Sequence, residues 1–175
     1  RLSSVEALGS VNIICSDKTG TLTKGEMSVR KIFLEYSEID VTGVGYEPKG
    51  KFIFKDGGLN LKTQETLDFI LRIGLLCNDS QLKNENGKWR ILGDPTEGAL
   101  VVAAYKKELF KEILEKEFPR IDEIPFSSES KMMTTIHKHH SRLFAFSKGA
   151  GEKILERCKL DEPEKRQLLD KSDQM

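Results

Sequence analysis

The sequence predicts an α+β fold, in which a mostly antiparallel sheet is flanked by helices. Candidate helices and strands follow one another without the regular alternation that is typical of parallel sheets. An Asn-Gly pair at residues 86–87, flanked by alternating apolar residues, indicates a tight hairpin between antiparallel strands. With 175 residues, 38% of them hydrophobic, the chain is long enough for one compact domain and part of a second.

The first candidate element is the apolar run from Val11 to Ser16, which predicts a strand buried on both faces, as in parallel sheets. Asp17 follows at its carboxyl end, where open α/β sheets place reactive groups. A carboxylate there is a candidate nucleophile, and the alternative is a polar turn formed by Asp17 and Gly20. We expect the strand to be held weakly, because the strands it would pair with lie outside the sequence.

The pattern changes at Lys24-Gly25, so we expect one unit at residues 1–24 and a second at 25–175. Residues 26–36 predict a strand, a Gly- and Pro-containing stretch follows at 42–50, and residues 52–54 predict a short strand.

A helix and a hairpin are expected next. Thr63 is a candidate cap for a helix whose apolar face contains Leu67, Ile70, Leu71 and Leu75. Around the turn at 86–87, the expected alternation is carried by Leu82, Asn84, Trp89 and Ile91. A second helix opens at Asp94-Pro95, and we expect it to continue past Tyr105 toward Phe118.

The last third of the chain predicts three strands and two helices. The strands are expected near 121–126, 131–137 and 143–147. One helix then places Ile154, Leu155 and Cys158 on one side, and a charged helix closes the chain. His137, His139 and His140 fall at an expected hairpin tip, and we interpret them as an exposed loop rather than a metal site.

Composition excludes several classes of partner. Lys+Arg and Asp+Glu are 28 each, so no net basic field draws the chain to nucleic acid or anionic membranes. The longest apolar run, residues 69–77, is too short to span a bilayer and carries Arg72.

The N-terminus lacks a signal-peptide pattern, and Cys15, Cys77 and Cys158 fit buried, reduced cysteines of a cytosolic protein. We therefore expect a soluble, monomeric piece.

Residues 17–23 read Asp-Lys-Thr-Gly-Thr-Leu-Thr, a string too specific to arise readily by chance. It resembles the phosphorylation signature of the P-type ATPases, ion pumps that pass through an aspartyl-phosphate intermediate. The resemblance implies that Asp17 attacks the γ-phosphoryl group of ATP, that Lys18 adds positive charge, and that Asp17 and Thr19 contact Mg²⁺. Phosphatases of the related haloacid dehalogenase superfamily usually carry an aspartate as general acid where this chain has Thr19.

Three later stretches extend the resemblance to the nucleotide-binding domain of these pumps, most closely the branch of the calcium and sodium-potassium pumps. They are residues 93–100, residues 125–133, and residues 147–150 followed by Glu152. The resemblance implies that Phe126 stacks on adenine, that Glu97 faces it, and that Lys148 lines the pocket floor. Lys131 would lie near the nucleotide, while Gly149 and Ala150 would leave room for it.

Each of these residues also has a structural interpretation. Glu97 falls where a capping box places its carboxylate, behind Asp94 as cap and Pro95 at the first helical position. Phe126 alone would more often be a core aromatic at a strand end, and Lys148 a solvated lysine. Their joint occurrence behind residues 17–23 favours the functional interpretation.

The chain departs from the family pattern at Ser128 and Ser130, where arginines are common, and at Gly151, where proline is usual. It stops at Met175, before the segments that supply further magnesium-binding aspartates and a second lysine, so we expect no phosphoryl transfer by this fragment alone. Residues 1–24 would begin the phosphorylation domain, and 25–175 would form most of the nucleotide-binding domain.

The parent protein is then expected to be a membrane pump with this segment on the cytoplasmic side. The partners of this segment would be the remaining phosphorylation, actuator and transmembrane domains, and calcium is the leading candidate for the cation. Two other classes remain open: a free-standing haloacid-dehalogenase-type phosphotransferase or phosphatase, and a non-catalytic nucleotide-binding module.

Overall fold

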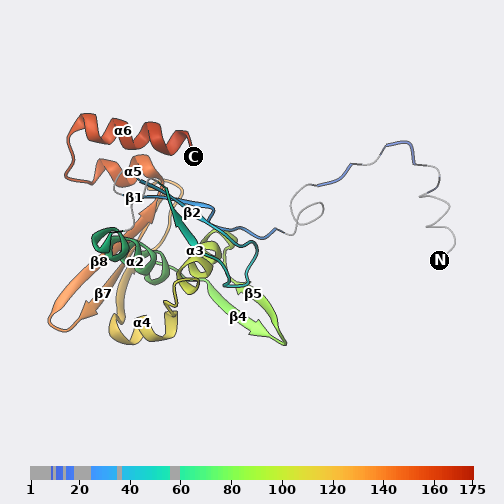
Figure 1. Cartoon of the computed structure of the whole chain (residues 1–175), viewed down its shortest axis with the longest axis horizontal. Coiled ribbons are helices and arrows are strands. Elements are labelled where there is room, and N and C mark those ends of the chain that lie inside the picture. Colours follow the sequence, from blue (N-terminus) through green and yellow to red (C-terminus); the bar gives the residue numbers. More distant parts are fainter. Residues whose placement is uncertain (1–8, 10, 14, 18–24, 35–36, 56–59) are drawn as a thin grey trace.

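The computed structural model describes residues 9, 11–13, 15–17, 25–34, 37–55 and 60–175. Within these residues the elements alternate irregularly between strands and helices (Figure 1). In chain order they are β1 (Lys31–Leu34), β2 (Ser37–Val41), β3 (Phe52–Phe54), α2 (Leu61–Leu76), β4 (Gln81–Glu85), β5 (Lys88–Leu92), α3 (Pro95–Tyr105), α4 (Lys111–Glu117), β6 (Arg120–Ile124), β7 (Met132–His139), β8 (Arg142–Gly149), α5 (Gly151–Glu156) and α6 (Glu162–Asp173).

The strands form three small sheets in the order β1-β2-β3, β4-β5 and β6-β7-β8, and every pairing among the described residues is antiparallel. The prediction of an α+β fold with a mostly antiparallel sheet is therefore confirmed. Residues 11–13 and 15–17 extend away from this body, and the hairpin β4-β5 projects from it (Figure 1). Among the helices described, none combines the length and the hydrophobicity that a membrane-spanning segment requires.

The core lies between α2, α3 and the inner face of β7 and β8. Leu67, Leu71 and Leu75 recur at helical spacing on one face of α2 and are buried. The facing helix α3 presents small residues, among them Gly98, Ala99, Ala103 and Ala104. These short side chains let the two helix backbones approach closely. The two helices form a central layer, against which β1, β4, β5, α4 and β8 pack.

Two helix boundaries differ from the predictions. Asn60, not Thr63, caps α2: its side-chain oxygen accepts a hydrogen bond from the Thr63 backbone N–H at 2.8 Å, and Thr63 lies within the first turn. The second helix begins at Asp94 as predicted but ends at Tyr105. Glu108 adopts a left-handed backbone with φ 59°, which an α-helix does not tolerate, so α4 is a separate helix.

The N-terminal prediction of a buried strand is wrong for the residues described. Residues 11–13 and 15–17 are assigned to no strand, and Val11 and Ile13 are exposed. A strand buried on both faces needs neighbouring strands and covering layers, and residues 11–13 and 15–17 belong to none of the sheets described. Exposed Cys15 likewise differs from its prediction, whereas Cys77 is buried and all three cysteines are free.

Several other expectations need smaller corrections. The strand expected at 26–36 covers Lys31–Leu34 among the described residues, because residues 25–30 are not paired in a ladder. Ile70 is 39% exposed and lies at the edge of the apolar face of α2. The strand expected at 121–126 ends at Ile124, β7 and β8 are longer than predicted, and Cys158 follows α5 instead of lying on it.

The predicted hairpin is confirmed. Asn86 and Gly87 have φ values of 54° and 82°, the left-handed pair that a type I′ turn requires. Leu82 pairs with Ile91, and Asn84 pairs with Trp89, so the expected alternation sets the register.

The histidine prediction is wrong for His137, which is buried in β7. Its Nδ1 donates to the Phe118 carbonyl oxygen at 2.8 Å, since a carbonyl can only accept, and its Nε2 then accepts from the Thr135 hydroxyl at 2.8 Å. His139 stacks on Phe118 with ring centroids 4.2 Å apart, while His140 is exposed. The rings of His139 and His140 lie 4.3 Å apart near the hairpin tip, whereas His137 is held inside the sheet by its own two hydrogen bonds.

We expect Leu75→Ala to lower the free energy of unfolding by about 2–5 kcal/mol, because it leaves a cavity in the layer between α2 and α3. Ile70→Ala on the same helix is the matched control and should cost less than about 1 kcal/mol, since Ile70 is already partly exposed. Urea denaturation of both variants measures the difference. Equal losses would show that the core does not lie on the face described.

The stability of the protein should fall as the pH is lowered through the titration of His137. Burial lowers the pKa of His137 below its ordinary value of 6.5, with a smaller contribution from the charge of Arg120. Below that value the unfolded chain binds a proton that the folded imidazole does not, so the free energy of unfolding decreases with falling pH. The His137→Gln variant should have a flatter stability profile between about pH 7 and pH 5. A wild-type slope retained in the variant would contradict this assignment.

Candidate functional site

A loop of four residues, Cys77 to Ser80, joins α2 to β4 and is held by contacts from several elements. The Cys77 thiol donates to the Met133 carbonyl oxygen at 3.6 Å. Asn78 is fully buried, and its side-chain amide donates to the carbonyls of Gly74 and Glu97, both at 2.9 Å. Its side-chain oxygen accepts from the Ser80 N–H at 2.8 Å. Asn78 thus ties the end of α2 to the start of α3.

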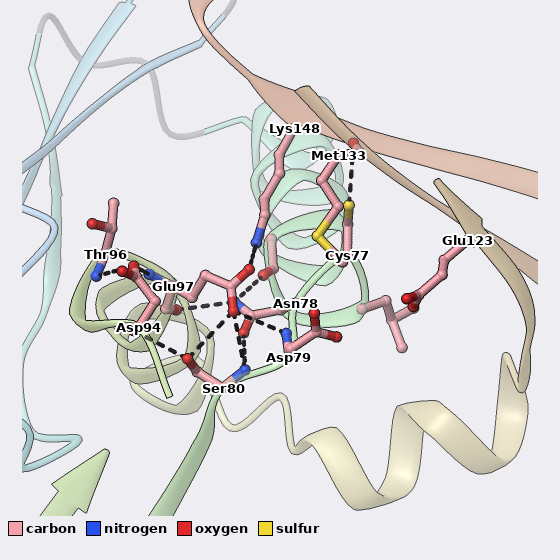
Figure 2. Close-up of polar contacts among 12 residues, drawn as sticks. Cys77, Asn78, Asp79, Ser80, Asp94, Thr96, Glu97, Glu123, Met133 and Lys148 are labelled. Carbon is pink, nitrogen blue, oxygen red and sulfur yellow. Dashed lines mark hydrogen bonds and ion pairs between the residues drawn. The ribbon is translucent and has the colours of Figure 1, made fainter. Parts of the chain in front are cut away.

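Glu97, on the first turn of α3, directs its carboxylate into this loop (Figure 2). Its Oε2 accepts hydrogen bonds from the backbone N–H of Asp79 at 3.0 Å and of Ser80 at 3.1 Å, and from the Ser80 hydroxyl at 3.3 Å. The cap of α3 is supplied by Asp94, whose side chain accepts from the N–H groups of Thr96 and Glu97. These bonds also lower the pKa of Asp94. The Glu97 carboxylate therefore binds the backbone of the Cys77–Ser80 loop instead of capping α3.

Lys148, near the end of β8, reaches Glu97 from the sheet side and forms an ion pair with its Oε1 (Figure 2). The side chains of Lys148 and Glu97 are 21% and 17% exposed, so the pair is largely shielded from water but open on one side. Such partly buried pairs gain more from Coulomb attraction than exposed pairs do. The structure thus brings together two predicted site residues that are far apart in the sequence.

Lys131, Gly149 and Ala150 lie together where β7 begins and β8 ends. A Cβ added to Gly149 would lie 2.3 Å from the Lys131 carbonyl oxygen, so this close approach requires glycine. The Ala150 N–H donates to the same oxygen at 3.0 Å. Lys131 has φ 50°, and its exposed ammonium lies 3.4 Å from Glu152.

Phe126 follows β6 and is 62% exposed, so it is not the core aromatic of the structural interpretation. Ile124 pairs with Thr134, and antiparallel continuation carries residues 125 and 126 toward the Met132–Gly149 end of the sheet. Ser127 and Ser130 close a turn there, with their hydroxyl oxygens 2.8 Å apart. Phe126, Lys131, Lys148, Gly149 and Ala150 therefore share one end of the sheet, and Glu97 meets them through Lys148.

Of the three residues predicted for phosphoryl transfer, the structure describes Asp17. Asp17 is exposed, and the Ser16 hydroxyl donates to its backbone oxygen at 3.2 Å. Lys18 and Thr19 lie outside the described residues. Among the residues described, no group of three or more His, Cys, Asp or Glu side chains is arranged to hold a metal ion.

Sequence reasoning missed two cations that hold the loop from the opposite side. Lys111 donates to the carbonyls of Asn78 and Ser80 at 2.7 and 3.0 Å. Arg120 donates to the carbonyls of Leu76 and Asn78 at 3.1 and 2.9 Å. The signal available in the sequence was the polar run Asn78-Asp79-Ser80 directly after an apolar helix, since its backbone groups need partners.

Two cavities in the described part of the chain lie away from these residues. One, of about 620 Å³, lies between Phe33 and α6. The other, of about 610 Å³, lies between the loop at 44–47 and β5. Neither of these two cavities is lined by the predicted site residues.

Comparisons with known proteins identify related sequences. The family described as P-type ATPase, cytoplasmic domain N, matches residues 66–174. A cation-transporting ATPase, pma1, from Synechocystis is 40% identical over 168 residues, which is 90% of this chain and 18% of that protein. A calcium-transporting ATPase from Bacillus subtilis is 40% identical over 158 residues, again 90% of this chain and 18% of that protein. A calcium-transporting ATPase type 2C member 1 from Bos taurus is 39% identical over 163 residues, 90% of this chain and 16% of that protein. The chain spans less than a fifth of the length of these relatives.

We expect Glu97→Ala to lower the free energy of unfolding by about 2–4 kcal/mol, because it leaves the N–H groups of Asp79 and Ser80 without their acceptor and Lys148 without its counterion. Glu65→Ala, an exposed position on α2, should change it by less than about 0.5 kcal/mol. Urea denaturation measures both. A loss for Glu97→Ala no larger than the control would mean that the network contributes nothing to stability.

Proposed function

Because the chain belongs to the P-type ATPase family and corresponds to its cytoplasmic domain N, we propose that residues 25–175 bind adenine nucleotide for a cation-transporting pump. Residues 1–24 would begin the phosphorylation domain of the same pump. The parent protein would lie in a membrane, with this segment on the cytoplasmic side next to the remaining phosphorylation, actuator and transmembrane domains.

One observation carries the proposal: the Glu97–Lys148 pair lies at the sheet end where Phe126 is exposed. An exposed aromatic ring at the same end of the sheet as two lysines fits a ligand with a flat base and negative phosphates. Phe126 would stack on adenine, Glu97 would accept a hydrogen bond from the base, and Lys148 and Lys131 would attract the phosphates. Gly149 lets the end of β8 lie close against the Lys131 carbonyl oxygen and so shapes this end of the sheet, and Ala150 adds only one methyl group.

In the parent pump, Asp17 would be the nucleophile that accepts the γ-phosphoryl group, with Lys18 beside it and Mg²⁺ contacting Asp17 and Thr19. Bound Mg²⁺ would neutralise charge on the transferring phosphoryl group. The Asp17 carboxylate offers oxygen atoms of the kind that Mg²⁺ prefers, and Asp17 is exposed to solvent. Calcium is the leading candidate for the transported cation, because two of the relatives are named calcium-transporting ATPases.

Adenine nucleotides should bind weakly, with dissociation constants of about 1 mM. Stacking on Phe126 contributes about 1–3 kcal/mol, and one or two hydrogen bonds add about 1 kcal/mol each, which together approach the roughly 4 kcal/mol of millimolar binding. Ser128 and Ser130 offer no charge to the phosphates, so ATP, ADP and AMP should differ by less than about tenfold. Titrations followed by backbone amide shifts measure each constant.

The same titrations of variants locate the pocket. Phe126→Ala should weaken ATP binding at least about fivefold, corresponding to the lower limit of stacking. Lys148→Ala should weaken it less at high salt than at low salt, because salt screens the attraction. Phe69→Ala, a half-exposed ring on α2, is the control and should leave binding unchanged. Binding that survives Phe126→Ala, or micromolar ATP binding with a hundredfold preference over AMP, would place the nucleotide elsewhere.

A further inference from the structure

A buried ammonium group lies behind the loop that holds Glu97. Lys111, the first residue of α4, is 6% exposed, and its Nζ donates to the carbonyls of Asn78 and Ser80 at 2.7 and 3.0 Å. The Glu115 carboxylate is 3.9 Å from this Nζ. Burial lowers the pKa of Lys111, so the charged form is held there at a free-energy cost.

Arg120 approaches the same loop from β6. Its Nη2 donates to the Asn78 carbonyl at 2.9 Å, and its Nη1 forms ion pairs with Asp79 and Glu123, both at 2.7 Å. The Asn78 carbonyl oxygen therefore accepts from two cations, one buried and one partly exposed.

That carbonyl and the Asp79 N–H belong to one planar peptide group. The N–H donates to the Glu97 carboxylate at 3.0 Å. Cations at the oxygen end polarise the peptide group and strengthen the donor at its nitrogen end, because linked hydrogen bonds reinforce one another. A continuous path thus runs from Lys111 through this peptide group to Glu97 and from there to Lys148.

We propose that Lys111 is a positioning residue of the nucleotide site: it holds the 78–80 backbone so that Glu97, and through it Lys148, faces the nucleotide. Lys111 itself touches no ligand. This inference rests on the proposed function. A role in stability alone would not require the charge, since a well-packed apolar side chain often stabilises such a site as well as a buried ion does.

Lys106 provides a matched control. It lies at the end of α3, and its Nζ donates to the carbonyls of Thr42 and Gly43 at 2.8 and 3.4 Å. Burial lowers its pKa as well. Lys106 therefore shares the chemistry of Lys111 but is only partly buried and anchors a different loop, so Lys106→Met measures the general effect of removing a lysine that binds backbone carbonyls.

The test is titration of the whole chain with ATP, followed by backbone amide shifts, for Lys111→Met, Lys106→Met, Glu97→Gln and Lys148→Ala. If Lys111→Met fails to fold, Lys111→Gln replaces it. Urea denaturation of each variant establishes that it is fully folded under the conditions of the titration. Lys111→Met should weaken ATP binding about fivefold and move the Asp79 and Ser80 amide signals of the free protein. Lys106→Met should leave both unchanged. In the Glu97→Gln background, Lys111→Met should have no further effect on affinity.

Equal losses of ATP affinity in Lys111→Met and Lys106→Met would overturn the inference. So would an undiminished effect of Lys111→Met in the Glu97→Gln background. If Glu97→Gln weakens ATP binding while Lys111→Met does not, the positioning role fails and the proposed function stands. If the wild-type chain binds no ATP, or if Glu97→Gln and Lys148→Ala both leave affinity unchanged, the proposed function fails and this inference fails with it.

Discussion

The backbone of the Cys77–Ser80 loop must find hydrogen-bond partners in the interior of the protein, and much of the structure is arranged to supply them. The N–H groups of Asp79 and Ser80 meet a carboxylate from α3, while the carbonyls on the other side meet cations from α4 and β6. A buried peptide group without a partner costs about 1–3 kcal/mol, so each of these elements is held in place by the same requirement. The loop thereby connects the helical layer to the sheet.

This requirement couples the stability of the domain to the chemistry of its surface. Glu97 satisfies two backbone donors with one oxygen and pairs with Lys148 through the other. The pair is largely shielded from water and lies at the sheet end that carries Phe126. A ligand that binds there meets charges whose orientation is already set by buried bonds, so little ordering is needed on binding. The Glu97–Lys148 pair is thus held rigidly by the interior of the protein while a ligand can still reach it from solvent.

Local interactions explain why parts of the fold could be predicted from the sequence. The Asn86-Gly87 turn and the Asp94 cap depend on residues a few positions apart, and the structure has both. Errors arose where nearby alternatives compete or where partners are distant. Asn60 and Thr63 are both good caps, and the left-handed Glu108 gave no sequence signal at the end of α3. The apolar pattern of residues 11–16 indicated burial, but burial requires neighbouring strands that this part of the structure does not provide.

By itself, the sequence determined the irregular order of helices and strands, the hairpin register and the family to which the chain belongs. It also identified the residue types that suit nucleotide binding. Tertiary structure alone decided that the Glu97 carboxylate binds backbone groups 17 and 18 residues away instead of capping its own helix. It also decided that Lys148, 51 residues away in the sequence, pairs with Glu97, and that His137 is buried. The physical reason is that hydrogen bonds between distant segments depend on which elements pack together. A local pattern of residues does not specify which distant segments come into contact.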